Sequence, residues 1–254
     1  MRKVLTTALL LSVSLALAIS GEEVMQKVDA HPSPASMEGT MVMQLIGKQG
    51  KVLTREIRVW SKKSGDEEKM LIKFLAPADV KGTAFLTIKK GGKEEMKLYL
   101  PALKRVRRIA GSQKKGSFMG SDFSYDDISN LSGLDIADYT HELLRTENEG
   151  GVKVYVVEST PKPGVDSSYS KQIAWVPADT FVPRRIEFYK KGKLYKVLTN
   201  REVKPFADGK YLIPTLLEME NVTTGHKTVL EQKDLQIDVP IDDAVFTERF
   251  MKKR

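Results

Sequence analysis

Residues 98–127 of this 254-residue chain read LYLPALKRVRRIAGSQKKGSFMGSDFSYDD, and three unlike segments adjoin there. The first continues an alternation of apolar and polar residues from Met96, which predicts a half-buried strand ending before Pro101. The second, residues 104–108, places four basic side chains around Val106. The third begins at Gly111, lacks a periodic pattern and is interrupted by four apolar or aromatic residues: Phe118, Met119, Phe123 and Tyr125. Long segments between strands commonly carry function, so we expect a functional loop here.

Most of the remaining chain alternates with a period of two residues between turn signals, which indicates a mainly β, antiparallel fold. The pattern predicts a hairpin over residues 36–59 and strands at 69–75, 83–88, 96–100, 140–146, 152–159, 171–176, 183–189, 194–200, 211–219 and 227–237. Apolar residues at helical spacing predict a short helix at 22–30. Ser124 as a cap, with Asp126 and Asp127 in the first turn, predicts a second short helix at 125–130. One more helical turn is expected around Val245, followed by a frayed basic end. No linker or repeat divides the pattern, so we expect one domain.

The N-terminus has the features of a secretory signal peptide. A positively charged start precedes an uncharged apolar run from Val4 to Ala18, which is short for a membrane span. Small residues allow cleavage after Ala18 or after Ser20, and the sequence leaves both open. We therefore expect a signal peptide over residues 1–20 and an exported, periplasmic protein that is soluble after cleavage.

The composition of the chain excludes several kinds of catalytic and metal-binding site. The chain has no cysteine, which excludes disulfides, thiol catalysis and thiolate metal sites. Its three histidines lie far apart and outside any metal or protease motif, and the spacing of Asp122, Asp126 and Asp127 does not match a calcium loop. The net charge is +8, and without Arg2 and Lys3 it is +6, from 39 basic and 33 acidic residues. This excess fits contact with anionic lipid headgroups or an acidic partner, and we find no nucleic-acid-binding motif. We expect no enzyme activity, metal, cofactor or nucleic-acid partner.

Two features have both a structural and a functional interpretation. Met37, Met41 and Met43 share one face of a predicted strand, where soft, unbranched side chains suit an ordinary core or a cavity that accepts varied acyl chains. Arg105 and Arg107 share another strand face, which fits a solvated sheet edge or a docking patch.

The runs LYLPALKRVRRI and GSFMGSDFSYDD, together with DYTHELL from Asp138 to Leu144, resemble the periplasmic outer membrane lipoprotein-sorting protein family. This family is a LolA-like branch of the superfamily of lipoprotein carriers. The resemblance covers residues 21–254 and implies a mainly β (α+β) domain. Its single curved antiparallel sheet would form a half-open barrel, with a few short helices covering the concave face and an apolar ligand between them.

The resemblance also implies a function. We expect a monomeric, non-enzymatic carrier that binds acyl chains of a lipoprotein or other lipid, meets an inner- or outer-membrane protein and shuttles its cargo toward the outer membrane. The alternative is a cargo-free periplasmic accessory or lipid-sensing regulator of a membrane transporter. The expected cavity lining comprises Met41, Met43, Leu45, Met70, Ile72, Phe74, Met96 and Leu98. The expected lid or docking loop comprises Arg105, Arg107, Gly116, Phe118, Met119, Gly120, Asp122, Phe123 and Tyr125, with Phe118 and Met119 as its exposed tip.

Overall fold

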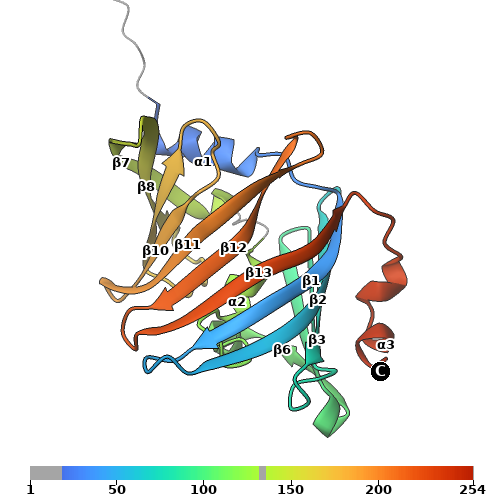
Figure 1. Cartoon of the computed structure of the whole chain (residues 1–254). Helices are drawn as coiled ribbons and strands as arrows, with labels where there is room; N and C mark the ends of the chain where they lie inside the picture. Colours follow the sequence, from blue (N-terminus) through green and yellow to red (C-terminus); the bar gives the residue numbers. More distant parts are fainter. Residues whose placement is uncertain (1–18, 132–135, 254) are drawn as a thin grey trace, which may run out of the picture.

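The computed structural model describes residues 19–131 and 136–253, so nearly all of the predicted signal peptide lies outside the described residues. Within that part, the strands form one antiparallel sheet of 13 strands in the order β6-β5-β4-β3-β2-β1-β13-β12-β11-β10-β9-β8-β7 (Figure 1). The strands are β1 Ser36–Ile46, β2 Val52–Ser64, β3 Glu67–Ala76, β4 Ala84–Lys90, β5 Lys93–Leu100, β6 Arg105–Ile109, β7 Tyr139–Glu149, β8 Val152–Pro161, β9 Lys171–Pro177, β10 Arg185–Lys190, β11 Lys193–Phe206, β12 Tyr211–Asn221 and β13 His226–Ile237. The predicted fold class, a curved antiparallel sheet with a few short helices, is confirmed.

The strand order explains what lies inside the curve. Strands β6 and β7 are consecutive in the chain but stand at opposite edges of the sheet, so the connection between them must cross one face. Figure 1 shows the sheet curving around this connection, which includes α2 (Tyr125–Ser129). Short 3-10 helices precede and follow α2, at Pro101–Leu103, Gly111–Lys115 and Ile136–Asp138.

The register keeps apolar side chains on the concave face from strand to strand. Met43 pairs with Leu230 of β13, Ile57 pairs with Phe74, and Phe85 pairs with Leu98. Because side chains alternate between faces, a slip of one residue would turn each of these rows to solvent. The burial of this face therefore fixes the register.

Helix α1 (Gly21–Asp29) covers the concave face at the β7 end of the sheet. Ser20 begins it with a capping box, because its hydroxyl accepts from the Glu23 N–H and Glu23 accepts from the Ser20 N–H. Val24 and Met25 are buried against strands β8 and β9. The predicted helix at 22–30 is confirmed.

The C-terminal tail packs on the convex face. A 3-10 helix at Asp243–Phe246 and α3 (Glu248–Met251) lie outside β3, as Figure 1 shows. Phe246 is buried and Met251 is fully buried against a cluster that includes Leu71 and Leu86. The prediction of a frayed C-terminal end is therefore wrong for the residues up to Met251, because the buried Met251 side chain packs the last helical turn against the sheet.

Candidate functional site

The residues expected to line a cavity all lie together on the concave face. Seven are buried and Met70 is half-buried, and the eight belong to one apolar cluster: Met41, Met43, Leu45, Met70, Ile72, Phe74, Met96 and Leu98. Their shared face follows from period-two alternation on β1, β3 and β5. Whether they contact a ligand stays a prediction, because the protein's own chain covers them.

We call that covering segment, residues 116–131, the plug. It begins with a tight turn in which the Phe118 N–H donates to the Phe123 carbonyl at 2.7 Å and the Ser121 N–H donates to the Phe118 carbonyl at 2.9 Å. Phe118 and Phe123 are both fully buried. The Phe118 ring lies 5.3 Å from the Phe85 ring and 5.4 Å from the Tyr125 ring, between centroids. The plug thus fills the concave face with aromatic side chains.

The prediction that Phe118 forms part of an exposed loop tip is wrong. Its ring points into the sheet because burying an aromatic side chain there removes a large apolar area from water. Asp122, Phe123 and Tyr125 are buried too, Met119 is half-buried, and Gly116 and Gly120 are exposed. The loop is therefore a plug in this structure, and its role as a lid stays a prediction.

Asp122 anchors the plug to β13. Its carboxylate accepts from the Thr228 hydroxyl at 2.7 Å and lies 2.7 Å from His226 Nδ1, while its N–H donates to Thr228 Oγ1 at 2.9 Å. The Asp122 and Thr228 side chains are buried, and Thr228 stands on the apolar concave face. Sequence reasoning missed Thr228 and His226, since their partner is more than a hundred residues away in the chain.

A second anchor is a buried charge. Lys196 projects from β11 onto the concave face, where its Nζ lies 3.1 Å from Asp127 Oδ2 and 3.3 Å from the Tyr169 hydroxyl. That hydroxyl donates to Asp127 Oδ1 at 2.8 Å. Burial raises the pKa of Tyr169 well above its ordinary value, and the neighbouring Asp127 carboxylate raises it further. Tyr169 therefore stays protonated and remains a donor at neutral pH.

Further polar contacts hold the two ends of the plug. Arg55 on β2 donates to the Met119 carbonyl, and burial lowers the pKa of its guanidinium. Lys89 donates to Asn130 Oδ1 at 2.7 Å. Asp126 accepts from Ser168 at 2.9 Å, and burial raises the pKa of this carboxyl. The plug is thus held to the sheet by polar anchors around an aromatic centre.

Arg105 and Arg107 lie on β6 at the edge of the sheet and are exposed. They pair with Leu100 and Leu98 of β5, so both side chains project toward the concave side. The prediction that they share one strand face is confirmed. The Arg107 charge partly offsets the rise in the pKa of Tyr125 that burial causes. The two arginines therefore flank the plug at its open edge.

The described residues display no group suited to hold a metal ion, and none of their helices is long and apolar enough to cross a membrane. His141 has both ring nitrogens engaged, with Ser159 Oγ at 2.8 Å and the Ile136 carbonyl at 3.1 Å. His141 is therefore a strand histidine whose hydrogen-bonding capacity is satisfied within the fold.

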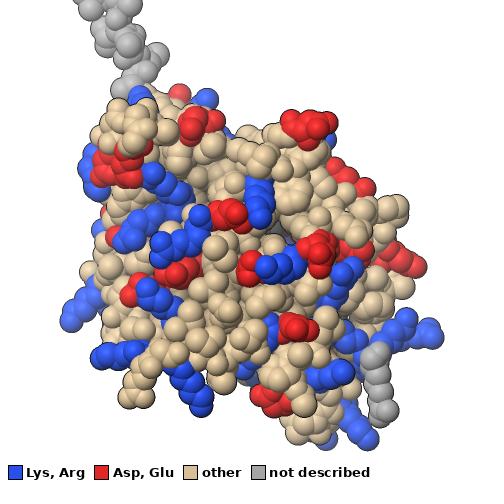
Figure 2. Space-filling view, in the orientation of Figure 1, with Lys and Arg blue, Asp and Glu red and all other residues tan. Residues whose placement is uncertain are grey.

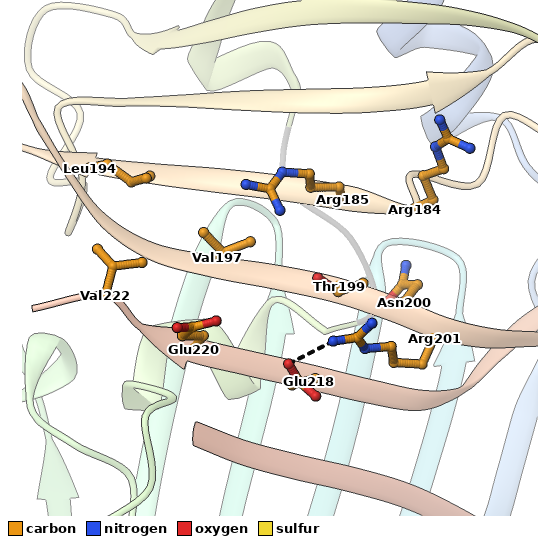
Figure 3. A pocket seen from close by; sticks show the side chains of 10 residues that line it. All are labelled: Arg184, Arg185, Leu194, Val197, Thr199, Asn200, Arg201, Glu218, Glu220 and Val222. Atoms are coloured by element: carbon orange, nitrogen blue, oxygen red, sulfur yellow. Dashed lines mark hydrogen bonds and ion pairs between the residues drawn. The ribbon is translucent and has the colours of Figure 1, made fainter. Parts of the chain in front are cut away.

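Two pockets lie away from the concave face. One, of about 450 Å³, opens on the convex side of β10–β12, and Figure 3 shows Arg201 paired there with Glu218 at 2.9 Å. Arg185 at the same pocket is paired with Glu187 at 2.6 Å, so its charge is already compensated. The other, of about 560 Å³, lies where the C-terminal tail leaves β13 beside Ser36 and Lys62. Neither is lined by the residues expected to contact acyl chains.

Comparison with known proteins agrees with this architecture. A family model described only as an uncharacterised protein matches residues 66–253. The crystal structure of a DUF1329 family protein from Desulfovibrio piger is 34% identical with a TM-score of 0.84, and the match covers 91% of this chain and 97% of that one. A putative outer membrane lipoprotein-sorting protein domain from Vibrio parahaemolyticus is 36% identical with a TM-score of 0.83, covering 92% and 98%.

A LolA superfamily protein from Nitrosomonas europaea has the same fold, with 24% sequence identity and a TM-score of 0.71. The match covers 92% of this chain and 100% of that one. No curated protein matches the chain at a significant level. The resemblance to lipoprotein-sorting proteins with a LolA-like fold is confirmed, and the chain belongs to the DUF1329 family.

Proposed function

We propose that this protein is a periplasmic carrier that binds the acyl chains of a lipoprotein or other lipid on its concave face and shuttles them toward the outer membrane. One observation carries the proposal: the concave face is an apolar floor covered by a plug that polar anchors hold in place. The Vibrio parahaemolyticus relative, described as a lipoprotein-sorting domain, supports the same class of cargo.

The energetics of the plug suit exchange with a lipid. When the plug leaves, its hydrogen bonds are replaced by bonds to water. A neutral bond contributes about 0.5–1.5 kcal/mol net, and a bond to a charged group such as Asp122 or Asp127 contributes about 1.5–3 kcal/mol. Exposing the apolar area beneath Phe118 and Phe123 costs roughly a further 25 cal/mol per Å². An acyl chain that occupies the same floor restores that burial, so cargo stabilises the open arrangement. Transfer then needs no chemistry, only the displacement of the plug.

A disulfide across the first anchor tests this mechanism. Thr228 Oγ1 lies 2.7 Å from Asp122 Oδ2, so the variant Asp122→Cys/Thr228→Cys places two thiols within reach of each other. The chain has no other cysteine to compete. We expect the oxidised variant to exclude a fluorescent fatty acid and the reduced variant to bind it. Each single variant, treated with the same oxidant, is the matched control and should bind the probe in both states.

Equal binding by the oxidised and reduced forms would contradict the use of the concave face. The alternative function, a cargo-free accessory or lipid-sensing regulator, is favoured by the burial of the apolar floor under the plug. Mass spectrometry of lipid extracted from natively purified protein distinguishes the two, because a carrier should retain stoichiometric lipid and a cargo-free accessory none.

A further inference from the structure

Exposed apolar side chains gather at one end of the sheet. Of the six exposed large hydrophobic residues among those that the structure describes, five lie where β1, β3, β5 and β12 end or β2 begins: Val52, Leu53, Leu75, Leu103 and Val222. The sixth, Leu144, lies on edge strand β7. Val52 and Leu53 are about half exposed, at 48% and 52%, and Leu103 is 63% exposed. Single exposed apolar residues are ordinary, but their concentration at one end marks an interaction surface.

Lysines accompany these residues. Four turns at this end, residues 47–51, 101–104, 190–193 and 222–225, contain six lysines and no carboxylate: Lys48, Lys51, Lys104, Lys190, Lys191 and Lys193. All six are exposed. Two other connections at this end, residues 77–83 and 162–170, carry one lysine and one aspartate each. The end as a whole is therefore basic.

These lysines are not engaged in ion pairs. Within residues 19–131 and 136–253, none of the six forms a salt bridge, and Lys190 lies 5.2 Å from the Tyr195 ring centroid. At the opposite end of the sheet, by contrast, Lys63 pairs with Glu68 at 2.8 Å and Lys69 pairs with Glu67 at 2.9 Å. The six lysines at the end that carries the apolar residues thus have no ion-pair partner among the described residues.

Three of the turns lie side by side. In Figure 1 the β1–β2, β12–β13 and β10–β11 turns follow one another along the lower left edge of the molecule, and Figure 2 shows basic side chains projecting there. A Cβ atom at Gly225 would lie 3.7 Å from Lys48 Cγ, so the first two turns touch. We call turns 47–51, 190–193 and 222–225, with Val52 and Leu53, the basic rim.

The basic rim borders the plug. Arg55, three residues after Val52, holds the Met119 carbonyl, and His226, which follows turn 222–225, contacts Asp122. A surface that docks at the rim would therefore meet the half-buried Met119 and the exposed Gly120 of the plug.

We propose that the basic rim docks on an anionic lipid bilayer, with its lysines on the headgroups and its exposed Val and Leu side chains in the interfacial region. Lysines interleaved with aliphatic residues on protruding turns match such a surface, since each Lys is attracted to an anionic bilayer and the apolar side chains add buried area. Long Lys side chains keep their charge in water while their stems lie along apolar surface. This docking is independent of the acyl-chain proposal, because the rim is a different surface from the covered concave floor.

Flotation with vesicles tests the proposal on the mature chain. We expect the wild-type protein to bind vesicles that contain phosphatidylglycerol and not vesicles of phosphatidylcholine alone. The variant Lys48→Glu/Lys51→Glu should weaken binding by about tenfold or more at low salt. The matched control, Lys90→Glu/Lys93→Glu, makes the same charge change on the β4–β5 turn at the opposite end, and should weaken binding by less than about threefold, as expected for charges beyond a Debye length.

Leu53→Ser should reduce vesicle binding at low and high salt alike, because burial of an apolar side chain is not screened. Absence of wild-type binding to phosphatidylglycerol vesicles would overturn the bilayer as the partner. Equal losses in the two charge-reversal variants would overturn the rim as the docking site. Neither variant should change fatty-acid binding by the soluble protein, so failure here is distinguishable from failure of the carrier function.

Discussion

At the scale of single residues, Lys196 is the clearest case of a charge placed for a specific contact. Its side chain and that of Asp127 are each only 7% exposed, so the pair is cut off from water. Removing one partner leaves the other charge buried without full compensation, which costs about 3–5 kcal/mol in comparable pairs. Lys196→Met should therefore lower the free energy of unfolding by about 3 kcal/mol, since Tyr169 still donates to Asp127. Chemical denaturation of the purified variant measures the loss.

The control for Lys196 lies on the convex face. Lys171 pairs with Glu158 at 2.6 Å, but its side chain is 33% exposed, and exposed pairs contribute about 0–1 kcal/mol. Lys171→Met should thus change stability little. In Lys196→Met/Asp127→Asn the unpaired carboxylate is gone, and much of the lost stability should return. If the double variant were no more stable than Lys196→Met, the buried charge would not be the cause.

At the scale of elements, α1 depends on the absence of a side chain at Gly21. A Cβ there would lie 2.6 Å from the Glu142 carbonyl carbon and 2.6 Å from the Leu143 nitrogen, both backbone atoms of β7. Because strand backbone does not rotate out of the way, the helix itself would have to move from the sheet. Gly21→Ala should destabilise the protein by about 1–3 kcal/mol despite the better helix propensity of alanine.

Gln26→Ala is the matched control, because Gln26 is exposed on the same helix. It should be neutral or slightly stabilising in the same denaturation experiment. A stable Gly21→Ala variant with α1 still docked, as judged by protection of its amides from hydrogen exchange, would show that the contact with β7 tolerates a shift.

At the scale of the whole molecule, the strands of the sheet can be predicted from the sequence, whereas the packing of the plug on the concave face cannot. Period-two alternation locates the strands because one face of each is buried, and that signal is local. The burial of Phe118 has no such signal, since it depends on β6 and β7 standing at opposite edges of a sheet of 13 strands. Lys196 and Thr228 likewise look like polar interruptions of apolar strands. Their partners lie 69 and 106 residues away, and only the fold brings them together.

The choice between the two predicted signal cleavage sites also depends on the folded molecule. Ile19 packs against the apolar cluster under α1, and Ser20 supplies the capping box of that helix. Cleavage after Ser20 would remove both and leave the amino group on buried Gly21, where a charge is unfavourable. Cleavage after Ala18 keeps them. We therefore expect the intact mass of the exported protein to begin at Ile19, and a mass beginning at Gly21 would contradict this expectation.

Two further measurements on the exported protein depend on the same choice. The hydrogen bond from the Ser20 N–H lowers the pKa of Glu23, with the Ser20 hydroxyl adding to the effect. An acid whose pKa is lowered in the native state stabilises the fold at pH values above its ordinary pKa, here 4.5. That stabilisation is lost as the pH falls through the native pKa. Titration of Glu23 by NMR should therefore give a value below 4.5 if Ser20 is retained. Ser20→Ala should then also cost about 1 kcal/mol of stability at neutral pH, the usual value of an N-cap, whereas a chain that begins at Gly21 would make this substitution silent.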